Sequence, residues 1–131
     1  MERRPVSPWT WQEQFGFAQA CEVTSAQRIL WCTGQASTDP DGHPVHPGDL
    51  RAQLHQSFDN LQTVLSAADL SMAHVVRLTC YSTDPDAMLA IWDDLRDRLE
   101  TGACRPALTL IGVHRLAYPE LLVELEATAA A

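Results

Sequence analysis

The 131-residue chain lacks several patterns that would identify common classes of protein. No hydrophobic run approaches the roughly 20 apolar residues that a membrane-spanning helix needs. The first residues, MERRPVSPWTW, carry two arginines but no apolar run behind them, which indicates neither a secretory signal nor a membrane anchor. The sequence therefore predicts a cytoplasmic protein with no membrane partner.

Positive charge is also scarce in this sequence. Lysine and arginine together number 9 against 17 acidic residues, which gives a formal net charge of -8. A nucleic-acid backbone would repel such a chain. We therefore expect no nucleic-acid partner.

The sequence carries no motif for a nucleotide, a serine nucleophile or a metal cluster. It has no P-loop, dinucleotide-binding fingerprint or G-x-S-x-G, so we expect no cofactor. His43 and His46 lie among aspartates, but the surrounding prolines favour a solvated loop, and we expect no metal. Four cysteines lack C-x-x-C spacing and are interpreted as buried reduced thiols, namely Cys21, Cys32, Cys80 and Cys104.

What the chain does have is the pattern of one α+β domain spanning 1–131. Apolar residues recur at steps of three and four in two segments, which predicts helices at 48–68 and 84–102. Asp49 suits the positive end of the first helix dipole, and Gly102 ends the second helix. Strands are expected at 17–24, 28–34, 75–83, 107–115 and 121–129. These elements favour one sheet with both helices on one face.

The last two strands suggest that the second face of the sheet is also covered. In 121–129, the residues that alternate with the apolar set include Leu122, Glu124 and Glu126, and 107–115 adds Leu108 and Leu110. We interpret this as an open face that mixes leucines with carboxylates. A second copy of the chain is the simplest cover for such a face, so we expect an oligomer.

Several segments resemble the YjgF/RidA family along nearly the whole length. They include FGFAQACEV, RILWCTGQASTD, a helix with the Gln53, Asp59, Asn60 and Leu61 pattern, VVRLTCYSTD, and a final VELEATA. The resemblance implies a chorismate-mutase-like fold with one mixed sheet, and a homotrimer around a central barrel with clefts between subunits. It also implies a small-molecule substrate, because the best-known members hydrolyse imines and enamines such as 2-aminoacrylate.

The resemblance places hydrophobic residues where deaminating members have polar ones. Leu108 stands at the position of the arginine that grips the substrate carboxylate, and leucine offers no donor for an anion. Trp92 stands in place of an asparagine, Leu110 in place of a cysteine, and Phe17 in place of a tyrosine. Arg105 is three residues from Leu108 and is interpreted as a residue of the preceding turn. The cleft is therefore expected to accept an aromatic or aliphatic group.

The acidic residue of the family pattern is retained. Glu124 matches the glutamate that handles water, and Glu126 shares its face of the strand about 7 Å away. Burial should raise the pKa of the more buried carboxyl and suit it to acid/base work, or Glu124 could only accept structural hydrogen bonds. Thr33 and Gly34 match the loop that lines the cleft from a neighbouring subunit, or they form a tight strand exit. His114 is a weaker candidate for proton transfer.

Two functions from different classes remain open on these residues. The first is an enzyme that acts on an imine or enamine with Glu124 as acid/base, by hydrolysis or by a bond-forming or isomerising step in a specialised biosynthetic pathway. The second is a non-catalytic trimer that binds or stabilises a small molecule. Classical deamination of 2-aminoacrylate is not expected with leucine at 108.

Overall fold

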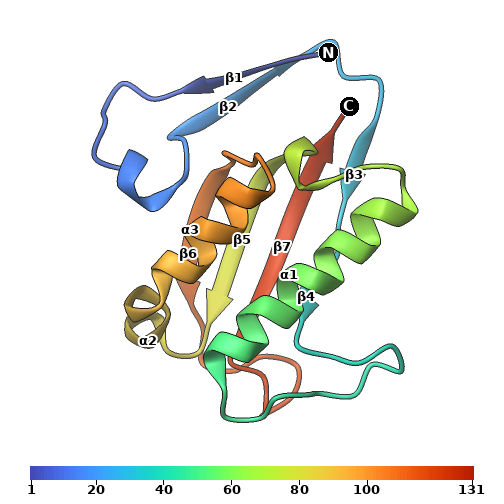
Figure 1. The fold of residues 1–131 in the computed structure, drawn as a ribbon, viewed down its shortest axis with the longest axis vertical. Coiled ribbons are helices and arrows are strands. Elements are labelled where there is room, and N and C mark those ends of the chain that lie inside the picture. The colour runs from blue at the N-terminus through green and yellow to red at the C-terminus, as the bar shows by residue number, and fades with distance from the viewer.

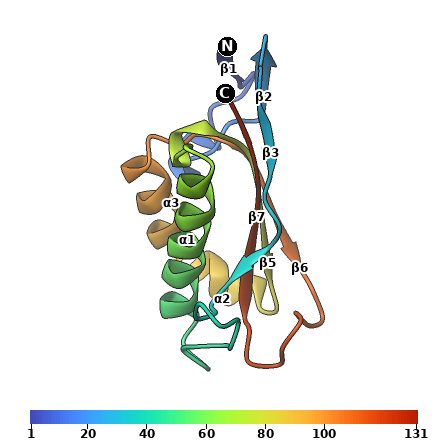
Figure 2. The ribbon, with the colours of Figure 1, turned by 90° about the vertical axis from the view of Figure 1, so that its right-hand side faces the viewer.

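The computed structural model describes residues 1–131 and has the expected α+β architecture. Four strands form a sheet in the order β3-β7-β5-β6, and the short β4 also pairs with β7 (Figure 1). Figure 2 shows the helices on one side of this sheet and the other side uncovered. The elements are β1 (Glu2–Val6), β2 (Ala20–Thr24), β3 (Ile29–Trp31), β4 (Gln35–Ala36), α1 (Leu50–Ala67), β5 (Val75–Ser82), α2 (Pro85–Ala90), α3 (Trp92–Thr101), β6 (Ala107–Gly112) and β7 (Val123–Ala130).

The first predicted helix is confirmed as α1. The Asp49 side chain accepts a hydrogen bond from the Ala52 amide and so satisfies one of the free donors at the helix start. The apolar stripe faces the sheet, and its central residues Leu54, Phe58 and Leu61 are completely buried. Truncating a buried phenylalanine to alanine costs about 3–5 kcal/mol in typical cores, so this stripe contributes strongly to stability.

The second predicted helix is divided into α2 and α3 at Ile91. Asp84 caps α2 by accepting from the Ala87 amide, and a proline occupies the first turn, as is common at helix starts. The apolar stripe nevertheless continues across the break and is buried along its length, through Met88, Trp92, Leu95 and Leu99. The prediction of the buried face is confirmed, whereas the prediction of one continuous helix is wrong.

The register of the sheet decides which residues share a face. β5 pairs in parallel with β6 and antiparallel with β7, so the sheet is mixed as expected. Thr79 pairs with both Thr109 and Glu126, and these three lie on the open face. Leu78 pairs with Leu108 on the helix face. The expectation that the leucines of β6 share a face with the carboxylates of β7 is therefore wrong, because parallel pairing with the buried side of β5 turns them inward.

The apolar part of the open face comes from other strands. Ile29 and Trp31 on β3 pair with Ala130 and Thr128 of β7 and are 51% and 75% exposed. Ile111 on β6 is exposed on the same face. Large apolar side chains left exposed on a sheet face are typical of an interaction surface.

The N-terminal segment forms a hairpin outside the main sheet. β1 pairs antiparallel with β2, and a single turn of 3-10 helix at Glu13–Phe15 follows β1. Ala18 then forms a parallel bridge with Ala107, which brings the end of this segment beside β6. All four cysteines are free thiols, and no helix is long and apolar enough to cross a membrane.

Candidate functional site

Four of the predicted site residues lie together in one pocket beside β6. The apolar pocket, as we name it here, has a volume of about 200 Å³ and seven hydrophobic lining residues: Trp11, Phe15, Phe17, Leu89, Trp92, Leu108 and Leu110. Phe17 is positioned by the neighbouring Ala18, whose amide donates to the Pro106 carbonyl at 2.9 Å. The hydrophobic lining expected for the cleft is therefore present, although it lies on the helix side of the sheet.

Three aromatic rings from the N-terminal segment form one wall of the apolar pocket. The centroid of the Trp11 ring is 6.4 Å from that of Phe15 and 6.1 Å from that of Phe17, in edge-to-face contacts. Phe15 and Phe17 are stacked with their centroids 6.4 Å apart. These are favourable separations for aromatic pairs, so the rings support one another. Sequence reasoning identified Phe17 but missed Trp11, Phe15 and Leu89.

Trp92 connects this aromatic wall to the helix layer. Its indole Nε1 donates to the Phe15 carbonyl at 3.0 Å, a contact between residues 77 apart in the chain. The bond satisfies the one polar group of the indole and leaves only its carbon surface for the pocket. As a result the apolar pocket offers a ligand contact area but no titratable group.

Glu124 and Gly34 meet on the open face of the sheet, away from the apolar pocket. Glu124 lies on β7 opposite Ala36 of β4, and Gly34 immediately precedes β4. A methyl group at Gly34 would overlap the Glu124 carboxylate, with Cδ only 2.6 Å away. Because glycine has no side chain, position 34 leaves room for the Glu124 carboxylate to lie against the backbone. Thr33, one residue earlier, is exposed, and its carbonyl accepts from the Gln35 amide at 3.2 Å.

The surroundings of Glu124 alter its protonation. Burial, and secondarily the negative charge of Glu126, raise the pKa of the Glu124 carboxyl above its usual value. Tyr81 pairs with Glu124 across the strands, and its hydroxyl donates to Glu126 Oε1 at 3.2 Å. Burial and this hydrogen bond raise the pKa of Tyr81 as well. Tyr81 was missed as a site residue, although alternation along β5 would place it beside the carboxylates.

Within one chain the predicted site residues therefore form two separate groups. Leu108 and Leu110 point toward the helices, whereas Glu124 points to the open face. The sheet lies between the two groups, so a single copy cannot bring a ligand in the apolar pocket onto the Glu124 carboxylate.

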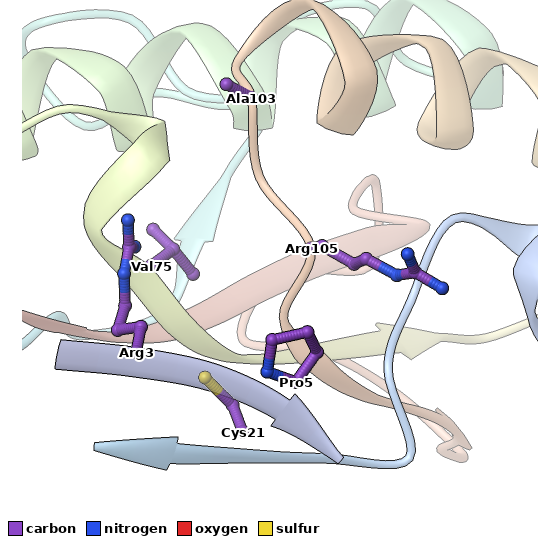
Figure 3. Close-up of a pocket in the computed structure, with 6 residues that line it drawn as sticks. All are labelled: Arg3, Pro5, Cys21, Val75, Ala103 and Arg105. Carbon is purple, nitrogen blue, oxygen red and sulfur yellow. The ribbon is translucent and has the colours of Figure 1, made fainter. Parts of the chain in front are cut away.

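Arg105 does not line the apolar pocket. Its guanidinium lies 3.7 Å from a Glu13 carboxylate oxygen, and the residue lines a different cavity of about 170 Å³ beneath the hairpin (Figure 3). Arg3 lines the same cavity, donates to the Ala73 carbonyl, and points away from Arg105. The interpretation of Arg105 as a residue of the turn agrees with this placement.

The histidines lie outside both groups. His43 joins Asp39 and Asp41 in a cluster whose possible ligand atoms lie within 4.8 Å of one another. Asp39 already accepts from the Asp41 and His43 amides at 2.9 Å each, which is an ordinary loop-closing turn. His114 is exposed and lines a separate surface depression near Tyr118.

Comparison with known proteins places these features in a family context. A sequence model of the family described as Endoribonuclease L-PSP matches residues 15–131. The chain is 33% identical over 100 residues to Protein DfrA of Myxococcus xanthus, over 76% of this chain and 74% of that protein. It is 28% identical over 126 residues to a RutC family protein of Pyrococcus horikoshii, over 96% and 89% of the two chains.

Solved structures of similar proteins share the fold. A protein of unknown function of the Rid family, YyfB from Yersinia pestis, is 39% identical with a TM-score of 0.88, and each chain is covered completely. The YjgF gene product of E. coli is 24% identical with a TM-score of 0.70, over 87% of both chains, a level that supports the fold alone. The α+β fold expected for this chain is confirmed.

Proposed function

The chain belongs to the YjgF/RidA family, whose sequence model carries the description Endoribonuclease L-PSP, and on that premise we propose an enzyme acting on imines or enamines. The reaction takes place in a hydrophobic cleft between two copies of the chain, with Glu124 as the acid/base. The observation behind this proposal is that the Glu124 carboxyl, with its raised pKa, and the apolar pocket beside β6 lie on opposite faces of the sheet.

Association of three copies would join the two groups. A closed ring of three copies uses the same head-to-tail contact three times, so each seam receives Glu124 from one copy and the apolar pocket from the next. The exposed Ile29, Trp31 and Ile111 on the open face supply apolar area for such a contact. We therefore propose a homotrimer with three equivalent clefts, in the cytoplasm.

Hydrolysis is the default chemistry of the proposed cleft. The imine reacts as its protonated iminium: the Glu124 carboxylate accepts a proton from water while the oxygen attacks the iminium carbon, forming a neutral carbinolamine. The resulting carboxylic acid gives this proton to nitrogen and becomes a carboxylate again. Ammonia then leaves as the carboxylate accepts the hydroxyl proton, a carbonyl compound remains, and the proton passes to solvent or ammonia. A raised pKa favours both the uptake and the return of the proton near neutral pH. All nine basic residues are arginines, so no lysine is present to form a Schiff base with a carbonyl.

Two other activities are less well supported by the same residues. Deamination of 2-aminoacrylate requires a grip on a small carboxylate, and the apolar pocket contains no cation. Cleavage of RNA, which the family description mentions, is disfavoured by the net charge of -8. A bond-forming or isomerising step on an iminium remains within the proposal, because the same acid/base would serve it.

The proposed reaction can be tested on a panel of imines generated from amino acids with small, aliphatic and aromatic side chains. Release of the carbonyl product should be accelerated for the hydrophobic imines and should fall strongly in Glu124→Gln, which keeps the shape but removes the titration. Equal acceleration by wild type and Glu124→Gln would overturn the role of this residue.

A non-catalytic trimer that binds or stabilises a small molecule is the second candidate. Leu108 favours it, because the loss of the arginine removes the contact on which deamination by relatives depends. This candidate predicts that a hydrophobic ligand is retained with no turnover of any imine in the panel. Leu108→Arg tests whether the absence of an arginine at this position prevents deamination. We expect background hydrolysis of 2-aminoacrylate by wild type and measurable hydrolysis by the variant.

A further inference from the structure

We infer that Trp11 is a specificity-determining residue that closes the apolar pocket over a neutral, flat ring of the ligand. The inference rests on the proposed function only for the statement that the ligand is the substrate. The binding of a ring in this pocket is independent of catalysis and can be measured alone.

The size of the apolar pocket fits one ring system. Its volume is about 200 Å³. A dry apolar cavity of about 150 Å³ in another protein is large enough to bind benzene. One aromatic ring, or a compact bicycle such as indole that remains partly in the opening, therefore matches the available space. A three-carbon substrate would leave most of it unfilled.

The chemistry of the lining selects against charge. All seven lining residues are hydrophobic, and the Nε1–H of the buried Trp92 is already donated to a carbonyl. Arg96 on α3, which lies against Gly16, forms ion pairs with Asp93, Asp97 and Glu100. A carboxylate inside this pocket would be buried without a partner, which is costly. The occupant is therefore a neutral group.

Trp11 is placed to contact such a group with most of its surface. Trp11 remains 55% exposed although it lines the pocket, so much of the ring surface is free to contact a ligand. Its ring is inclined by 67° to that of Phe15 and by 80° to that of Phe17, so neither phenyl ring stacks in parallel on it. The next residue, Gln12, is completely buried and accepts from the Gln19 amide, which anchors this part of the segment.

Trp11 lies just before the part of the chain that the family model matches, although a similar structure also covers this segment. The family match begins at residue 15, so Trp11 lies outside it, whereas Phe17, Trp92, Leu108 and Leu110 lie inside. The N-terminal segment thus contributes a wall to a pocket whose remaining sides belong to the matched region. A wall of this kind adjusts which ligand is accepted without altering the acid/base on the open face.

The test measures binding of indole, a neutral ring, and of indole-3-acetate, which adds a carboxylate, by isothermal titration calorimetry. Wild type should bind indole at one site per chain and indole-3-acetate at least tenfold more weakly. Trp11→Ala should weaken indole binding about tenfold, since an aromatic pair contributes on the order of 1 kcal/mol in addition to the area it buries. Trp11→Phe should recover part of the loss.

Trp9 provides a matched control in the same segment. It is 60% exposed and does not line the apolar pocket, so Trp9→Ala should bind indole as wild type does. Equal losses in the two variants, or no binding of indole by wild type, would overturn the inference. If Trp11→Ala instead dissociates the oligomer, the pocket holds a side chain of a neighbouring copy and the inference is again wrong.

Glu124→Gln separates this inference from the proposed function. The variant should bind indole normally even though it no longer turns over imines. Unchanged turnover in Glu124→Gln together with weakened indole binding in Trp11→Ala would overturn the proposed chemistry and leave the role of Trp11 intact.

Discussion

The apolar pocket and the open face of the sheet are complementary in chemistry and opposite in position. The apolar pocket has contact area and no titratable group. The open face has two carboxylates, a tyrosine and Arg77, whose guanidinium donates to Thr109, with the pKa of Glu124 raised, but no wall around them. Each region supplies what the other lacks. We conclude that binding and proton transfer are separable properties of this chain, and substitutions can address each of them alone.

The largest effect is expected on the open face. Replacing the Glu124 carboxyl with the amide of Glu124→Gln should lower kcat for the preferred imine by about 10²- to 10⁴-fold, the usual contribution of general acid/base catalysis. KM should change little, because the apolar pocket is untouched. Steady-state kinetics of ammonia release would check this. A parallel rise in KM would mean that the two regions are not separable.

The matched substitution in the apolar pocket should impair binding, whereas Glu124→Gln impairs catalysis. Leu108→Asp introduces a charge among hydrophobic side chains and should weaken ring binding by about 10- to 100-fold, at a burial cost of a few kcal/mol. The proposed seam brings this new carboxylate toward Glu124 of the neighbouring copy, so the pKa of Glu124, followed by NMR of the carboxyl carbon, should rise further. An unchanged pKa of Glu124 would contradict a cleft shared between copies.

A smaller effect is expected from Gly34→Ala. The added methyl group overlaps the Glu124 carboxylate, and a flexible side chain can move away at little cost in stability. We expect about tenfold slower turnover with Tm nearly unchanged. The control is Gly42→Ala in an open loop, where no atom lies within 4 Å but φ is +83°, so Tm should fall there while turnover is unaffected. A large loss of Tm in Gly34→Ala would show that the glycine serves the fold.

The smallest effect concerns stability against pH. The folded protein binds the Glu124 proton more tightly than the unfolded chain, whose carboxyl titrates near the usual value of about 4.3. The free energy of unfolding therefore loses a contribution as pH rises from that value through the raised pKa. Glu124→Gln removes this loss, so the variant should gain stability relative to wild type with rising pH. Denaturant titrations at pH 4 and pH 7 would measure it, and a constant difference would contradict the raised pKa.

The helix layer could be predicted from the sequence because the spacing of the apolar residues shows which face of each helix is buried. The stripe of Leu54, Phe58 and Leu61 repeats with the period of a helix, and all three are buried as expected. The raised pKa of Glu124 was also predictable in direction, since partial burial in a covered face disfavours the charged carboxylate and a second carboxylate two residues away faces the same side.

The placement of the pocket could not be predicted in the same way. Alternation divides a strand such as β6 into two sets of residues, but it does not tell which set faces the helices. That choice depends on parallel pairing of Leu108 with Leu78. The position of Trp11 depends on the contact between Trp92 and Phe15. These two residues are 77 apart in the chain, and no local sequence pattern predicts such a contact.

Complementation between two inactive chains tests the central account most directly. Glu124→Gln and Leu108→Asp would be co-expressed with different affinity tags, and mixed oligomers carrying both tags would be isolated and assayed on the preferred imine. If each seam joins Glu124 of one copy to the apolar pocket of the next, about a third of the seams in the isolated mixed trimers have both intact parts, because one seam of the three has the productive order. Recovery of activity near that fraction is the predicted result. Mixed oligomers as inactive as each variant alone would contradict a cleft shared between copies.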